Sequence, residues 1–103
     1  MSIKLEVTGQ LGKDPYVQTI DDLQVTILSM ACRSSTGLCA PIWVMGSIWE
    51  PRVGIFVQET FKKGDTITAF GTISKLGVYY NSEGKAKPGL DMFINAIGTK
   101  ERV

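Results

Sequence analysis

The chain has 103 residues, which is enough for one small globular domain. Hydrophobic residues make up 44% of it and charged residues 20%, an ordinary globular composition that argues against a disordered chain. The net charge of +1 gives no overall basic surface, so any affinity for nucleic acid must come from where the individual charges lie.

The residue types that are missing exclude several kinds of chemistry. The sequence has no histidine, which is the usual general base and the commonest metal ligand, and only two cysteines, Cys32 and Cys39. The missing residue types argue against catalytic activity and a metal site, and we also expect no cofactor and no small-molecule substrate. The cysteines are too few for a disulfide framework, and we expect two free thiols. No apolar run is long enough to cross a bilayer and no signal-type segment opens the chain, which predicts a cytoplasmic, nucleoid-associated protein without a membrane partner.

The N-terminal half shows the period-two alternation of β-strands. Residues 3–8 alternate apolar and polar side chains, which predicts a first strand with one buried face. Gly9 and Gly12 are predicted to flank a bend, and Asp21-Asp22 to mark a turn. Residues 23–33 and 40–49 are rich in apolar and β-branched side chains, so we expect a hairpin of the second and third strands with a short polar loop.

The C-terminal half contains the one predicted helix. Pro51 interrupts the strand pattern, and from residue 53 to residue 61 apolar side chains recur at helical spacing, followed by Lys62-Lys63-Gly64 as a helix C-terminus. Residues 66–76 and 90–98 are predicted as the fourth and fifth strands, with turns at 81–84 and 88–89. This order matches an all-β, five-stranded Greek-key OB-fold barrel over residues 1–103, with one helix between strands three and four. A split barrel of another type or an α+β sandwich would give a similar pattern.

Four segments carry motifs that point to one family. The segment GQLGKDP (residues 9–15) fits a G-x-L-G-x-D-P signature, and residues 59–71 fit E-x-x-x-K-G-x-x-V-x-x-x-G. Residues 24–31 and 42–49 look like the second and third strands, and Trp43 takes the tryptophan position of the third-strand pattern W-x-x-V-x-[FW]. The chain thereby resembles the bacterial single-stranded DNA-binding proteins. This resemblance implies an OB fold, commonly a homotetramer, that coats single-stranded DNA without strong sequence preference.

The chain departs from that family in three places. It stops at Val103, without the family's long tail and its acidic tip, so recruitment of other proteins by that route is not expected. The loop at residues 34–38 is short and has no counterpart of the family's loop aromatic. The family's G-K-L after the third strand is replaced by Glu50-Pro51-Arg52-Val53. A compact phage, plasmid or mobile-element version fits these differences, as does a primosomal accessory protein of the same lineage.

Aromatic side chains are the candidates for stacking on unpaired bases. Trp43 and Trp49 lie an even number of residues apart and should share a strand face, and they match family aromatics that stack on bases. The alternative is that one or both fill the core. Tyr79 and Tyr80 lie on the last hairpin, and since neighbours in a strand point opposite ways, only one should face DNA; hairpin packing or a subunit contact is the alternative. Phe70 faces away from the predicted core, where it fits either a stacking role or an oligomer interface.

Cations at strand ends and loops are the candidates for binding phosphates, with solvated surface charge as the alternative for each: Lys13, Arg33, Arg52, Lys75, Lys85 and Lys87. The sequence thus predicts a non-enzymatic protein that coats single-stranded DNA by stacking and phosphate contacts, in replication, recombination or repair. Wrapping DNA needs more than one barrel, so we expect a homodimer or homotetramer. The alternatives are a primosome-type accessory protein acting mainly through protein contacts, a small hydrolase, which the missing histidine disfavours, and an OB-fold phage protein without a DNA role.

Overall fold

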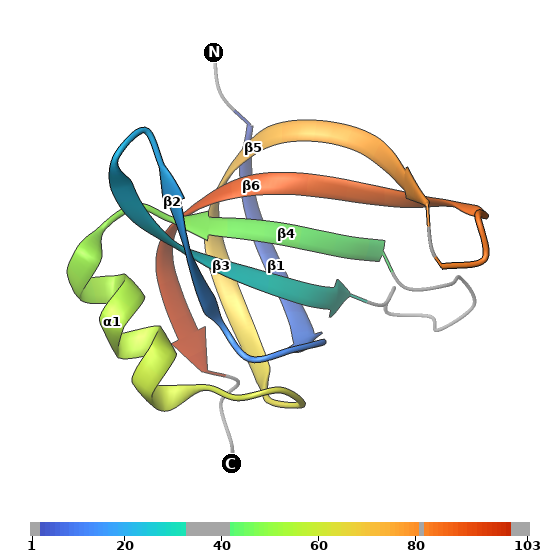
Figure 1. Cartoon of the computed structure of the whole chain (residues 1–103). Helices are drawn as coiled ribbons and strands as arrows, with labels where there is room; N and C mark the ends of the chain where they lie inside the picture. Colours follow the sequence, from blue (N-terminus) through green and yellow to red (C-terminus); the bar gives the residue numbers. More distant parts are fainter. Residues whose placement is uncertain (1–2, 33–41, 81, 100–103) are drawn as a thin grey trace.

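The structure is a computed structural model that describes residues 3–32, 42–80 and 82–99. Seven side chains within the last two strands fall outside the description: Leu76, Val78, Tyr79, Ala86, Lys87, Pro88 and Thr99. Along the described chain the elements are β1 (Lys4–Leu11), β2 (Tyr16–Ile20), β3 (Leu23–Cys32), β4 (Ile42–Ile48), α1 (Pro51–Thr60), β5 (Thr66–Tyr80) and β6 (Ala86–Thr99) (Figure 1). The fold is therefore mostly β, as predicted.

Five of the strands close into a ring. Their order is β1-β5-β6-β4-β3, and pairs such as Leu11↔Met30 join β1 back to β3. Neighbouring strands are antiparallel except β4 and β6, which run parallel. The closure depends on Gly9, because a Cβ there would lie 2.6 Å from the sulfur of Cys32 and 2.8 Å from the carbonyl oxygen of Ala31. β2 pairs with β3 alone and stands outside the ring.

The interior of the ring is apolar. Strands β4 and β5 contribute alternate side chains to it, such as Val44 and Ile48 from β4 and Ile67 and Ala69 from β5, as the period of two in a strand requires. Phe70, which follows Ala69 on β5, faces away from this interior, as predicted. The buried cluster consists of Leu11, Leu28, Met30, Val44, Ile48, Val57, Phe61, Ile67, Ala69, Met92 and Ile94.

Helix α1 packs against β3 and β4 through the fully buried Val57. It starts at Pro51, two residues before the predicted start, because proline is tolerated in the first turn and the Glu50 side chain caps it by accepting a 2.8 Å hydrogen bond from the backbone N–H of Val53. It ends at Thr60, so the assignment of Lys62-Lys63 to its C-terminus was wrong: they lie in the turn that follows.

Strand β2 was not predicted. Three of its five side chains are exposed, so the strand has no clear apolar alternation. The predicted turn after it is confirmed: Asp21 and Asp22 have positive φ angles of 50° and 66°, as a two-residue type I′ hairpin turn requires. The predicted bend at Gly9 was wrong, since β1 continues through it to Leu11.

The last hairpin is longer than predicted, because β5 extends to Tyr80 and β6 begins at Ala86. Pro88 and Gly89 therefore lie inside a strand, and the predicted turn there was wrong. Gly89 is the first residue of β6 with a described partner on β4, so Pro88 sits at the margin of the sheet, where a missing N–H is tolerated.

Candidate nucleic-acid interface

The outer face of β4 carries a row of large side chains. Alternate residues of the strand are buried, so Trp43, Met45 and Ser47 point away from the core, and Trp49 follows directly after the strand. β6 runs alongside and places Asp91 opposite Met45 and Phe93 opposite Ser47. We call this surface the β4 groove; its residues are Trp43, Met45, Ser47, Trp49, Asp91 and Phe93.

Three hollows follow one another along the β4 groove. The first, of about 430 Å³, and the second, of about 320 Å³, share Met45 and Asp91 in their walls. The second and the third, of about 620 Å³, share Trp49 and Phe93. Each hollow shares two lining residues with the next, so the three are neighbours in a row along the sheet.

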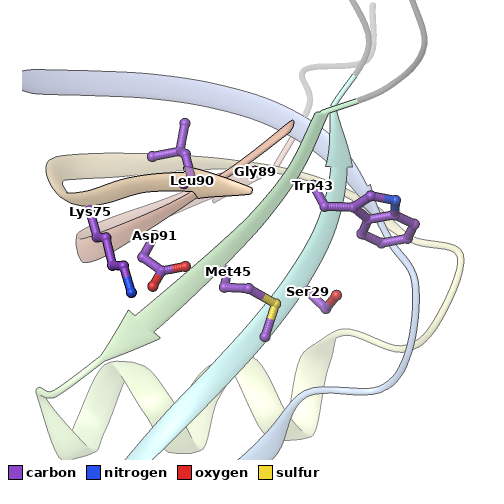
Figure 2. Close-up of a pocket in the computed structure, with 8 residues that line it drawn as sticks. Ser29, Trp43, Met45, Lys75, Gly89, Leu90 and Asp91 are labelled. Atoms are coloured by element: carbon purple, nitrogen blue, oxygen red, sulfur yellow. The ribbon is translucent and has the colours of Figure 1, made fainter. Parts of the chain in front are cut away.

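Trp43 is half-buried in the wall of the first hollow (Figure 2). Its indole lies against Gly12, where an added Cβ would be 2.7 Å from ring atoms Cη2 and Cζ3. The backbone N–H of Gly12 donates a 2.9 Å hydrogen bond to the carbonyl oxygen of Ser29 on β3. The second glycine of the GQLGKDP segment therefore provides the space in which the indole lies.

Trp49 is 39% exposed and held at two points. Its Nε1 donates a 3.0 Å hydrogen bond to Oγ of Ser47, and its ring meets Phe93 edge-on, with 6.4 Å between centroids. Phe93 is 44% exposed and was not predicted as a site residue, although its alternation with the buried Met92 and Ile94 could have identified it. Both predicted tryptophans thus reach the groove, and neither is sealed in the core.

Tyr16 brings a further ring to the groove from β2, in the wall of the second hollow. The Nζ atom of Lys13 lies 4.9 Å from the centre of that ring, within the range of a cation–π contact. Lys13 was predicted, whereas Tyr16 was missed because its strand was missed.

Lys75 lines the first hollow together with Asp91, its partner across β5 and β6. Both side chains are exposed at the rim. Asp91 was not predicted, since a single acid in an apolar strand gives no signal in a search for phosphate ligands. Among the described residues, the first hollow is therefore lined by one cation and one anion.

The structure places the other described candidates away from the hollows. Arg52 is exposed in the first turn of α1. Phe70 is 39% exposed on the sheet face that carries Glu6 of β1. Tyr80 and Lys85 are exposed around the β5–β6 turn. None of these four side chains is part of the walls formed by the described residues.

Three candidates cannot be placed as side chains. Tyr79 and Lys87 are register partners in the β5–β6 hairpin, but their side chains lie outside the described structure. Arg33 lies outside the described residues altogether, as does Cys39. Cys32 carries a free thiol, and partial burial raises its pKa from 9.0 to about 11.

Within residues 3–32, 42–80 and 82–99, no three acidic, cysteine or histidine side chains gather where they could hold a metal ion. In that same part of the chain, no helix has the length and apolar character needed to cross a membrane.

Comparison with known proteins finds similar structures but no similar sequence. No protein-family model matches the sequence, and no curated protein matches it either. The mitochondrial single-stranded DNA-binding protein of S. cerevisiae superposes with a TM-score of 0.71 at 16% identity, over 100% of this chain and 99% of that one. The small single-stranded DNA-binding protein of Streptomyces coelicolor superposes with a TM-score of 0.72 at 12% identity, over 97% and 95%. The chain therefore has the OB-type fold of single-stranded DNA-binding proteins, which is the fold that its sequence motifs predicted.

Proposed function

We propose that the protein binds single-stranded DNA along the β4 groove and coats it without strong sequence preference. The observation that carries the proposal is the gathering of Tyr16, Trp43, Trp49 and Phe93 in the walls of three neighbouring hollows. Every base has a flat face, so stacking on such rings contributes about 1–3 kcal/mol per base and tolerates any sequence. The structural relatives named above are themselves described as binding single-stranded DNA.

The phosphates need cations beside the rings. Among the described residues, Lys13 lies over the ring of Tyr16, where it can bind a phosphate next to a stacked base. With a net charge of only +1, the attraction must be local to the groove rather than a property of the whole surface. Affinity should therefore fall with salt, with a modest slope set by a few phosphate contacts.

The fold also favours the β4 groove as the DNA-binding surface. We interpret the five-stranded ring as the Greek-key barrel of the OB fold, whose second and third strands bind oligonucleotides in other proteins. The β3–β4 hairpin corresponds to that pair. We propose a role in replication, recombination or repair as a homodimer or homotetramer, with the exposed Phe70 and Ile3 available to an interface.

The test is a titration of oligo-dT followed by tryptophan fluorescence at low and high salt. The chain has two tryptophans, so Trp43→Phe leaves only Trp49 to emit and Trp49→Phe leaves only Trp43. We expect binding to quench the remaining emission in each variant and high salt to restore it. If low salt gives neither quenching nor binding, the proposal is wrong.

A matched pair of substitutions locates the binding face. Phe93 in the groove is 44% exposed and Phe56 on α1 is 51% exposed, and each meets one other ring edge-on. Phe93→Leu should weaken oligo-dT binding about fivefold or more, because it removes a stacking ring. Phe56→Leu should leave the affinity unchanged. Equal losses from both variants would place the DNA elsewhere.

A further inference from the structure

The first hollow of the β4 groove has a different character from the other two. Among the described lining residues, it alone carries a cation, Lys75, and it also carries the carboxylate of Asp91. The two residues are register partners across β5 and β6, so their side chains leave the sheet side by side (Figure 2). The volume of about 430 Å³ lies within the roughly 300–1,000 Å³ of small-ligand pockets.

A carboxylate at this position is unfavourable for a phosphate. An ionised Asp91 repels a phosphate oxygen and can only accept hydrogen bonds. Its place in the wall therefore directs the DNA backbone away and favours a group that donates hydrogen bonds. On an unpaired strand, those donors are the N–H groups on the base edges.

The remaining walls suit the flat body of a base. Trp43 and Met45 supply an aromatic ring and a polarisable thioether, and Leu90 adds an aliphatic surface. Gly77 and Gly89 add no side chains that would fill the space. The hollow is thus apolar around its sides, with its two charges together on one part of the rim.

Building on the proposed single-stranded DNA binding, we propose that this hollow selects guanine. The Watson–Crick edge of guanine presents the O6 acceptor, then the N1–H and N2–H donors. Lys75 donates to O6, and the two oxygens of Asp91 accept from N1–H and N2–H, a bidentate arrangement. Thymine offers one donor between two acceptors, while cytosine and adenine offer an amino donor beside a ring acceptor. Guanine alone offers two adjacent donors, one for each carboxylate oxygen, beside an acceptor for the ammonium group.

The consequence is a preferred register on a DNA strand that is otherwise bound without regard to sequence. The rings at Trp49, Phe93 and Tyr16 accept any base, whereas the first hollow adds selectivity at one position. Such a protein still coats oligo-dT. On a strand that contains a guanine near the binding site, it binds preferentially in the register that places this guanine in the first hollow.

The test uses oligo-dT of about ten nucleotides, within the site sizes of OB folds, with one central dT replaced by dG, dC, dA or deoxyinosine. The single guanine prevents quadruplex formation. We expect dG to bind about tenfold more tightly than dT, the size of a bidentate base contact. Deoxyinosine, which lacks only the N2 amino group, should fall between the two. Equal affinity for the dG and dT oligomers would overturn the proposal.

Substitution of the acid identifies its role. Asp91→Asn should reduce the dG-over-dT ratio to less than twofold, while its affinity for all-dT holds or rises because a repulsive charge is gone. A loss of folding would not give that pattern. Glu6→Gln makes the same charge change at an exposed position on β1 and should keep the full ratio. A ratio that survives Asp91→Asn overturns the guanine site but leaves DNA binding standing; failure of every oligomer to bind overturns both.

Discussion

The Oδ1 atom of Asp14 accepts a 2.7 Å hydrogen bond from the backbone N–H of Lys63, 49 residues further along the chain. Around this bond, Leu11 donates its backbone N–H to the carbonyl oxygen of Asp65, and Gly64 donates its own to the carbonyl oxygen of Leu11, both at 2.9 Å. The GQLGKDP and KKGD segments, which carry much of the family resemblance, therefore meet in space. Their residue types serve the architecture of the fold at this point.

Replacing Asp14 should destabilise the fold without altering the groove. Asp14→Ala leaves the N–H of Lys63 without its carboxylate acceptor, and we expect a loss of about 1–2 kcal/mol in the free energy of unfolding. Urea denaturation measures it, with Glu59→Ala on the exposed surface of α1 as the control. A loss no larger than that of the control would contradict the structural role of this bond.

Two glycines of β5 should respond in opposite ways to alanine. A Cβ on Gly71 would collide with the backbone carbonyl of Phe93, beside an irregularity in the β5–β6 register, whereas a Cβ on Gly77 would meet open space. Gly71→Ala should therefore lower the stability by about 3 kcal/mol. Gly77→Ala should hold or gain about 0.5 kcal/mol, because alanine restricts the unfolded chain. Thermal unfolding distinguishes the two variants. Similar melting temperatures would show that Gly71 does not lie as close to the carbonyl of Phe93 as described.

The salt dependence of DNA binding should identify the phosphate ligands. For a single strand, each neutralised phosphate contributes about 0.7 to the slope of log K against log salt. Lys13→Ala removes the cation over the Tyr16 ring and should reduce the slope by about that amount. Lys4→Ala removes an equal charge from β1, outside the walls of the groove, and should leave the slope as it was. If the two variants change the slope equally, the cations act through overall charge alone.

The thiol of Cys32 should react slowly at neutral pH. Burial raises its pKa to about 11, so in a Cys39→Ser background the rate of alkylation by iodoacetamide should rise about tenfold per pH unit through pH 9 and 10. A plateau below pH 10 would show an ordinary, accessible thiol.

The raised pKa of Cys32 also makes the stability of the fold decrease at alkaline pH. The unfolded thiol ionises near 9.0 while the folded one stays neutral to about 11, so the contribution of Cys32 is complete below pH 9 and declines between pH 9 and 11. Unfolding measured at pH 8 and pH 10 should show a steeper alkaline loss for the parent chain than for Cys32→Ala.

The fold was predictable where local pattern and burial agree. Phe70 was predicted to face away from the core and Asp21-Asp22 to form a turn, and both predictions hold. The predicted bounds of the strands were wrong where contacts between distant parts of the chain determine the structure. Pro88 signals a turn in any sequence, yet the margin of the long hairpin accommodates it as strand.

The groove was predictable only in part, for a related reason. Trp43 and Trp49 could be found because they lie an even number of residues apart on one short segment, β4 and the residue directly after it. Tyr16 comes from β2, and Asp91 and Phe93 come from β6; these two distant segments meet the outer face of β4 through the β2–β3 and β4–β6 pairings. A parallel pairing between distant strands leaves no local trace in sequence, so composition could not bring these side chains together.

Gly12 and Trp43 together determine how much order the protein must gain when DNA arrives. Because the indole of Trp43 already packs against the backbone of Gly12, it has few alternative rotamers to lose when DNA binds. The entropic cost of fixing the ring therefore arises largely during folding rather than during DNA binding. A larger residue at position 12 would displace the indole, so the ring would have to be ordered when DNA binds. Bound complexes would then dissociate faster even with every contact residue intact.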